Sequence, residues 1–292
     1  MDEFNENELQ ETLVVNIEDE TAEPSEPKQA PEKPKRQRKR LSRAGRNILR
    51  VILVLSLATA GYSGFQLYKG MKDYRDSENA YQNLAAAAES GSEELVTNDE
   101  GEGILYSKAD FNALAEINPD VTGWLILDGT VINYPIVQGT DNEYYLHHLF
   151  TGEANNTGCI FMDVDNAKDF SDRNTILYAH HMRNGSMFAE LEGYRKQDYY
   201  ETHKELLLQT PTQNYRVQPF AGLLTDGYSD YIQLEFADDE SFLSYVNNMI
   251  ASSTFQSDVK IGPEDRILTM STCRYDVENG RYAVFAKLTP IE

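Results

Sequence analysis

The chain has few cysteines and few basic residues. Two of its 292 residues are cysteines, Cys159 and Cys273, and they form no CxxC pair. A disulfide framework or a cysteine zinc site needs more cysteines than this, although a single disulfide between the two stays open. Lys and Arg number 26 against 48 Asp and Glu, which gives a formal net charge of -22. Because phosphate binding needs clustered basic residues, this balance argues against a nucleic-acid partner.

The sequence holds one long hydrophobic run, Val51–Tyr68, which is 18 residues long and carries no charge. Ten Lys or Arg residues precede it, between Lys28 and Arg50. A membrane-spanning helix needs about 20 apolar residues, and its positively charged flank stays in the cytoplasm. We therefore expect an uncleaved single-pass anchor. A cleaved signal peptide is the alternative, because Ala58–Ala60 resembles a cleavage site, although the leader would then be unusually long.

Composition divides the chain into four parts. Residues 1–47 are acidic and then basic, and we expect a disordered cytoplasmic tail there, since so polar a segment buries too little apolar surface to fold. Residues 48–68 are the predicted anchor. Residues 69–103 read as a helical stalk followed by a flexible linker. Residues 104–292 read as a globular domain, in which Ser107 is placed to cap a first short helix.

Short strand-like runs alternate with turn residues throughout the globular domain. One helical pattern interrupts them at residues 239–252, where apolar residues recur at helical spacing. Many short strands at this spacing predict a mainly β domain, either a closed barrel or a sandwich. The expected strands cover residues 124–127, 131–137, 159–163, 175–179, 206–209, 215–224, 231–236, 267–272 and 282–288.

The last two of these strands carry a cysteine and an arginine at facing ends. Cys273 ends the first strand, the turn Asn279–Gly280 follows, and Arg281 begins the second strand. A buried structural cysteine is the simpler alternative. However, a cation near a thiol favours the thiolate, and a cation near an attacked carbonyl stabilises an oxyanion. The hairpin therefore predicts a nucleophilic cysteine, with Arg274 as a second neighbouring cation.

A cysteine nucleophile also needs a histidine, and the chain has five. His180 and His181 end a predicted strand just before a glycine-containing turn, so either can lie over the same end of the domain as Cys273. Spacing alone does not choose between them. The other three read more simply as surface or packing residues: His147, His148 and His203.

Taken together, these residues resemble the class B sortases, which are membrane-anchored cysteine transpeptidases of Gram-positive bacteria. The resemblance covers roughly residues 104–288. It implies a closed sortase-type β-barrel of about eight strands, with N-terminal helices and a long helix inserted between two late strands. The motifs that carry it are Tyr178-Ala-His180-His-Met182 with Gly185-Ser-Met-Phe188, Thr269-Met-Ser-Thr-Cys273, Gly280-Arg281, Asn118-Pro-Asp-Val-Thr-Gly-Trp124 and Gly158-Cys-Ile-Phe-Met-Asp163.

The resemblance also implies roles for individual residues. It makes Cys273 the nucleophile, His180 rather than His181 the catalytic histidine, and Arg281 the essential arginine. It further implies a groove for the substrate peptide, whose matching positions are Asn142, Leu146, Ser271, Tyr231 and Ile232.

The implied activity is a transpeptidation outside the cell membrane. The enzyme would cleave a C-terminal sorting motif of exported proteins through a cysteine thioester, and pass the acyl group to an amine of a lipid-linked peptidoglycan precursor. A pilin-polymerising transpeptidase that uses a pilin lysine is a close alternative. A cysteine peptidase and a non-catalytic surface adhesion module are others. We expect no cofactor and no metal, because the acidic residues form no convincing calcium motif.

Overall fold

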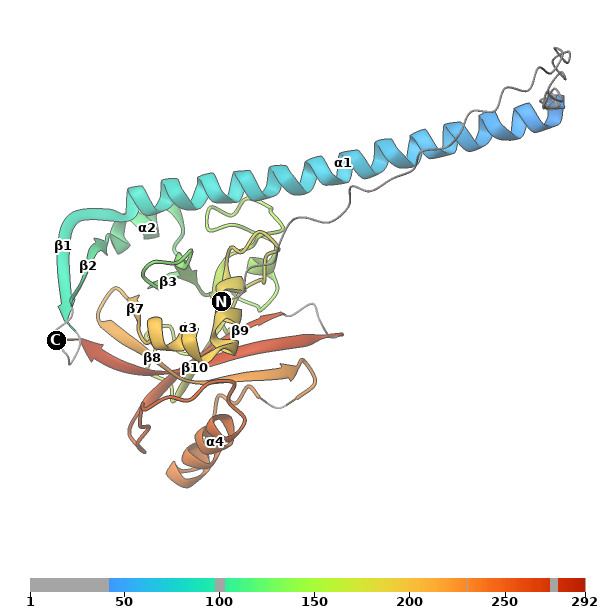
Figure 1. The fold of residues 1–292 in the computed structure, drawn as a ribbon. Coiled ribbons are helices and arrows are strands. Elements are labelled where there is room, and N and C mark those ends of the chain that lie inside the picture. The colour runs from blue at the N-terminus through green and yellow to red at the C-terminus, as the bar shows by residue number, and fades with distance from the viewer. Residues whose placement is uncertain (1–41, 98–102, 230, 274–277, 292) are drawn as a thin grey trace, which may run out of the picture. The chain divides into compact units, whose positions relative to one another are not determined.

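The computed structural model describes residues 42–97, 103–229, 231–273 and 278–291 (Figure 1). Contacts divide the chain into two compact units, Met1–Leu57 and Ala58–Glu292. The predicted tail at residues 1–41 lies outside the described residues. What the structure describes of the first unit is the beginning of one long helix.

That helix, α1 (Arg43–Ala88), is 46 residues long and contains the whole predicted anchor. Its most apolar window has a mean hydropathy of 1.7 and no buried residue, so it is long and apolar enough to cross a membrane. Leucines of this segment are exposed, such as Leu53 and Leu57 at 58% and 63%. One helix of this kind is a candidate membrane span.

The last turns of α1 belong to the second unit and pack against it along one face. The buried residues are Ser77, Tyr81, Leu84 and Ala88, spaced three or four positions apart as an amphipathic helix requires. The Tyr81 hydroxyl donates to the Gly158 carbonyl at 2.6 Å. The helical part of the predicted stalk is therefore fixed to the globular domain.

The beginning of the predicted flexible linker forms a strand. β1 (Glu89–Thr97) pairs in antiparallel fashion with β2 (Gly103–Ala109), and the two form a separate two-stranded sheet. Ser107 lies in β2 and does not cap the following helix, α2 (Phe111–Ile117). The cap is Asp110, whose carboxylate accepts from the N–H groups at positions 112 and 113. Residues 98–102 lie outside the described residues.

The domain is a closed barrel of eight strands, as the resemblance implies. Neighbouring strands follow the order β10-β8-β7-β3-β4-β5-β6-β9, and β9 closes the barrel against β10. The pairs β4–β5 and β6–β9 are parallel, and the others are antiparallel. The strands are β3 (Val121–Ile126), β4 (Asn133–Val137), β5 (Ile160–Met162), β6 (Asn174–Tyr178), β7 (Leu206–Gln209), β8 (Asn214–Asp226), β9 (Arg266–Cys273) and β10 (Gly280–Ile291).

The long helix α4 (Asp239–Ala251) is inserted between β8 and β9, which confirms the predicted architecture. Its N-terminus is closed by a capping box between Asp238 and Ser241. The prediction of a strand at 231–236 is wrong, because this segment has no strand partner and leads irregularly into α4. It is held by side chains instead: the Tyr245 hydroxyl of α4 donates to the Tyr231 carbonyl at 2.7 Å.

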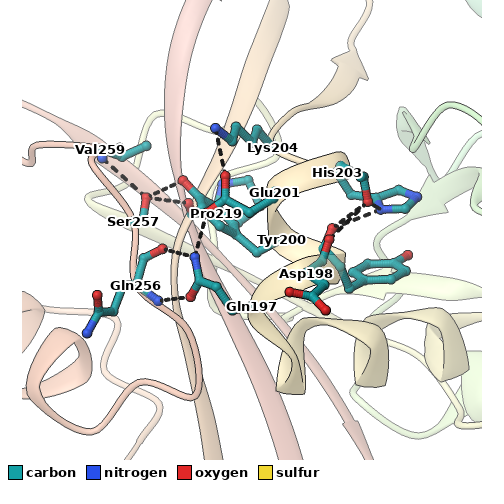
Figure 2. Close-up of polar contacts among 12 residues, drawn as sticks. Gln197, Asp198, Tyr200, Glu201, His203, Lys204, Pro219, Gln256, Ser257 and Val259 are labelled. Atoms are coloured by element: carbon teal, nitrogen blue, oxygen red, sulfur yellow. Dashed lines mark hydrogen bonds and ion pairs between the residues drawn. The ribbon is translucent and has the colours of Figure 1, made fainter.

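Three short helices were not predicted: η1 (Tyr144–Leu146), η2 (Phe188–Arg195) and α3 (Gln197–Thr202). Figure 2 shows how α3 fastens the segment that leaves α4. The Gln197 side chain donates to the Gln256 carbonyl at 3.0 Å and accepts from its N–H at 2.8 Å. The Tyr200 and Ser257 hydroxyls are 2.7 Å apart, and Ser257 also donates to the Pro219 carbonyl of β8. The connection that leads to β9 is thus bonded to α3 and to β8.

Alternate residues of β9 and β10 face two different hydrophobic clusters. Leu268 and Met270 of β9 belong to the larger cluster. Ile267 belongs to a second, smaller cluster with Phe285 of β10 and Phe242 of α4. Because side chains alternate along a strand, Thr269, Ser271 and Cys273 face the same side as Ile267. We call this side of the barrel the α4 face.

Candidate active site

Cys273 and Arg281 are direct neighbours at one end of the β9–β10 pair. The register of this antiparallel pair places their Cα atoms opposite each other. Arg281 has the same parity along β10 as Phe285, so both residues belong to the α4 face. The turn that joins the strands uses Asn279 at a φ of 52°, a left-handed conformation that asparagine tolerates. Arg281 Nη1 donates to the carbonyl of Gly280 at 3.0 Å, which fixes the guanidinium near this turn.

His180 reaches the same end of the barrel from β6. Strand β6 runs parallel to β9 with Tyr178 beside Ser271, and the Ala179 N–H still donates to the Ser271 carbonyl at 3.3 Å. Just past the end of β6, the Thr272 hydroxyl of β9 donates to the Ala179 carbonyl at 2.9 Å, so the chain still follows β9 as it reaches His180. Strands β9 and β10 and the segment that directly follows β6 therefore place the cysteine, the arginine and the histidine that the sequence selects at the same end of the barrel. Arg274 lies outside the described residues.

The His180 ring is held by a backbone carbonyl. Its Nε2 lies 2.8 Å from the Leu146 oxygen, and since a carbonyl only accepts, Nε2 carries the proton and Nδ1 is the nitrogen that titrates. Burial of the ring lowers the pKa of His180, the Leu146 carbonyl raises it, and the charge of His147 lowers it further. His181 is placed differently, since its Nδ1 faces the Glu192 carboxylate at 3.9 Å.

Substitution of His147 tests these opposing effects on the pKa of His180. Its ring centroid lies 6.3 Å from that of His180, so protonated His147 disfavours a second positive charge on His180. His147→Ala removes this repulsion, and we expect the pKa of His180 to rise. Titration of the His180 ring by NMR would measure the change, and the matched control is His148→Ala, whose ring stacks on Tyr144. A fall in the pKa of His180 in His147→Ala would contradict this electrostatic account.

The carbonyl that holds His180 depends in turn on Gly158. Gly158 has a φ of +65°, and a Cβ there would lie 2.6 Å from the Tyr145 oxygen and 2.8 Å from the Leu146 oxygen. The adjacent Cys159 N–H donates to the Tyr145 carbonyl at 2.9 Å. The absence of a side chain at Gly158 thus allows the segment before β5 to lie close to η1, where the Leu146 carbonyl accepts from His180.

Gly158→Ala is therefore expected to lower activity as well as stability. The left-handed backbone costs about 1–2 kcal/mol for a residue with a Cβ, and the collision displaces the Leu146 oxygen from the His180 ring. Gly129→Ala is a matched control, because Gly129 has a φ of +71° and open space around it. Thermal unfolding should show a loss in both variants, whereas a peptide-transfer assay should show a loss only in Gly158→Ala. Equal activity in the two variants would rule out this coupling.

The two cysteines have different surroundings. Cys159 is fully buried, and burial raises the pKa of its thiol to about 12. Cys273 is partly exposed, and both cysteines are free. The thiolate is the nucleophilic form, so Cys273 is the cysteine suited to chemistry.

Two of the predicted groove residues lie next to Cys273. The Ser271 hydroxyl, two positions before the cysteine, is 2.8 Å from the Tyr231 hydroxyl. Burial raises the pKa of Tyr231, while the Ser271 hydrogen bond and the charge of Arg281 lower it and Cys273 raises it, so the phenol lies within electrostatic reach of the site. Ile232 packs against the α4-face cluster, and the structure shows no closer relation of it to Cys273.

Asn142 and Leu146 lie in the loop that carries η1. Asn142 Oδ1 accepts from the Val164 N–H at 2.9 Å, and its Nδ2 donates to Asp163 at 3.1 Å. Leu146 contributes the carbonyl to His180. The Tyr178 hydroxyl donates to the same carboxylate at 2.8 Å. Neither Asp163 nor Tyr178 is predicted as a site residue from the sequence. An aspartate at the end of a strand carries no local signal of such a role.

Among the residues that the structure describes, no group of three or more His, Cys, Asp or Glu side chains is arranged to hold a metal ion. The polar groups gathered at this end of the barrel include a thiol, an imidazole, a guanidinium and several hydroxyls, with the Asp163 carboxylate beside them. Such a set suits acyl transfer, in which a nucleophile, a proton carrier and an oxyanion partner are needed.

Comparison with known proteins gives the family. A sortase-domain model matches residues 125–289. Sortase B of Listeria monocytogenes is 37% identical over 221 residues, covering 75% of this chain and 88% of that protein. Sortase B of Staphylococcus aureus is 36% identical over 188 residues, covering 64% and 77%.

Solved structures agree with these relatives. The structure of sortase B from Bacillus anthracis in complex with AAEK1 is matched with a TM-score of 0.65 at 32% identity, covering 76% of this chain and 100% of that one. A complex of the Staphylococcus aureus enzyme with substrate is matched with a TM-score of 0.60 at 37% identity, covering 62% and 85%. The chain therefore belongs to the sortase family. Its relatives place it in class B, so it is a sortase cysteine transpeptidase.

Proposed function

We propose that this sortase cleaves a C-terminal sorting motif of exported proteins and transfers the acyl part to an amine of a cell-wall precursor. The observation that carries the proposal is that Cys273 and Arg281 face each other on β9 and β10, while His180 directly follows the neighbouring strand β6 at the same end of the barrel. The sequence identity to two sortase B proteins supports it independently.

The reaction proceeds in two acyl transfers. The Cys273 thiolate attacks the carbonyl carbon at the cleavage site, and the Arg281 guanidinium stabilises the negative charge on the oxygen. The carbon–nitrogen bond then breaks, His180 as imidazolium gives its proton to the leaving amine, and a thioester remains. The acceptor amine attacks this thioester, neutral His180 accepts its proton, and the thiolate leaves.

The lowered pKa of His180 has a consequence for this scheme. The first step needs a thiolate together with an imidazolium, and burial of His180 reduces the share of imidazolium near neutral pH. The amount of this pair falls at low pH, where the sulfur is protonated, and at high pH, where His180 loses its proton. The rate should therefore have a bell-shaped dependence on pH.

We further propose that α1 is a single-pass anchor with the N-terminus in the cytoplasm and the barrel outside. The apolar window of α1 and the basic residues that precede it support this topology. An anchored enzyme meets exported substrates and lipid-linked acceptors at the same membrane surface. Cysteine-accessibility labelling in intact cells, with single cysteines placed before Arg43 and after Ala88, would test the orientation.

The activity is tested with purified full-length protein in detergent and a library of sorting-motif peptides. We expect a peptide acyl group bound to Cys273, detected by mass spectrometry, and a transfer product when a small amine is added. A product only of hydrolysis would favour the peptidase alternative. Transfer to a pilin lysine in preference to a peptidoglycan stem amine would favour pilus assembly, and no acyl-enzyme with any peptide would favour a binding module.

A further inference from the structure

Asp163 is a buried carboxylate beside the candidate active site, directly after the end of β5. Its side chain belongs to a residue that is only 5% exposed. The backbone is fixed on both sides, since the Asp163 N–H donates to the Ile176 carbonyl at 3.0 Å and its carbonyl accepts from Gln138 Nε2 at 2.7 Å. A buried charge is retained only where hydrogen bonds or a counter-charge compensate for its desolvation.

Three donors surround this carboxylate. Oδ2 accepts from the Tyr178 hydroxyl at 2.8 Å and from Asn142 Nδ2 at 3.1 Å, and Oδ1 accepts from the Asp165 N–H at 3.0 Å. Tyr178 belongs to β6, whereas Asn142 belongs to the loop that carries η1. One oxygen atom of Asp163 thus connects two separate elements that border the candidate site.

The directions of these hydrogen bonds decide what the two partners can offer to a substrate. Tyr178 gives its proton to Asp163, so its oxygen remains as an acceptor. Burial raises the pKa of Tyr178, and the charge of Asp163 raises it further, so the phenol keeps this proton. Asn142 uses Oδ1 for the Val164 N–H and one Nδ2 hydrogen for Asp163, which leaves the second Nδ2 hydrogen as a donor.

Tyr178 is also close to the reacting residues. It lies beside Ser271 in the β6–β9 register, two positions before His180. Its phenol interacts electrostatically with that of Tyr231, which lies near Arg281 and Cys273. Because paired residues of neighbouring strands point to the same side, Tyr178 faces the side of the barrel that carries Ser271 and Cys273.

We propose that Asp163 is a positioning residue that presents Tyr178 as an acceptor and Asn142 as a donor to the backbone of the sorting peptide. An acceptor and a donor held together are complementary to the N–H and C=O groups of an extended peptide. Because Asp163 fixes both side chains before the peptide arrives, less conformational freedom is lost on binding. This inference rests on the proposed function.

Its test is the steady-state kinetics of peptide transfer by the full-length protein in detergent. Asp163→Asn keeps the size of the side chain but removes the charge that orients both partners. We expect KM for the sorting peptide to rise about tenfold, as for loss of a hydrogen bond to a charged group, with kcat changed less than about twofold. The matched control is Asp165→Asn, an exposed neighbour that holds Asp163 only through its backbone N–H, and it should leave KM unchanged.

Double variants distinguish a positioning role of Asp163 from a purely structural one. If Asp163 acts through Tyr178, the rise in KM caused by Asp163→Asn should shrink in a Tyr178→Phe background. Should Asp163→Asn fail to fold, Tyr178→Phe still tests the inference, because it removes the hydroxyl that Asp163 holds and should likewise raise KM with kcat nearly unchanged. Fully additive effects, or a loss confined to kcat, would overturn the inference. A wild-type enzyme without turnover would instead overturn the proposed function, and the inference with it.

Discussion

Cys273→Ala is expected to lower transfer of a sorting peptide by a factor on the order of 10⁴ or more, because the thioester cannot form without the nucleophile. The only other cysteine, Cys159, cannot replace it. That thiol is buried, and its pKa is raised to about 12, so it supplies almost no thiolate at neutral pH. The rate of product formation by chromatography and the mass of the acyl-enzyme measure the effect.

Cys159→Ala is the matched control for this substitution. It removes the same functional group from the larger hydrophobic cluster, so we expect some loss of thermal stability and nearly unchanged transfer. A thiol-alkylating reagent should modify native wild-type protein at Cys273 before Cys159. Activity retained in Cys273→Ala and lost in Cys159→Ala would exclude the proposed mechanism.

Arg281→Ala is expected to lower kcat by on the order of 10²–10³, the usual effect of losing one partner of the oxyanion. KM should change much less, because the negative charge develops only as the thiolate attacks. Arg281→Lys keeps a positive charge but loses the planar donor geometry, so it should recover only part of the rate. Steady-state kinetics with one sorting peptide and a fixed amine measure all three enzymes.

Arg75→Ala is a suitable control for charge removal, since the Arg75 side chain is 67% exposed on α1. It should leave kcat and KM unchanged. If Arg281→Ala raised KM and left kcat intact, the guanidinium would bind the peptide in its ground state, and the role in transition-state stabilisation would be wrong.

Local sequence patterns predict much of the barrel, because strands are marked by alternating apolar and polar residues and are separated by turn-forming residues. The strand at 206–209 matches β7, and the helical pattern at 239–252 matches α4 to within one residue. The prediction of a strand at 231–236 is wrong for a physical reason. Its aromatic and β-branched residues suit a strand, but its side chains pack on the α4 face and its Tyr231 carbonyl bonds to α4.

The polar contacts around the site, in contrast, could not be predicted from local sequence. Asp163 looks like any polar residue after a strand, and nothing near it in sequence marks its contacts with Asn142 and Tyr178. Gly158 likewise gives no sign that its missing side chain makes room for the Leu146 carbonyl. These contacts join segments that only the closed barrel brings together.

The sequence by itself determined the candidate membrane anchor and the pairing of Cys273 with Arg281, since an apolar run and a hairpin are both local features. The tertiary structure decided how His180 joins them. Strands β6 and β9 are parallel neighbours, and parallel strands need a long crossover connection, which here contains η2, α3, two strands and α4. No local pattern encodes such a pairing, because its position follows from how all eight strands close into one barrel.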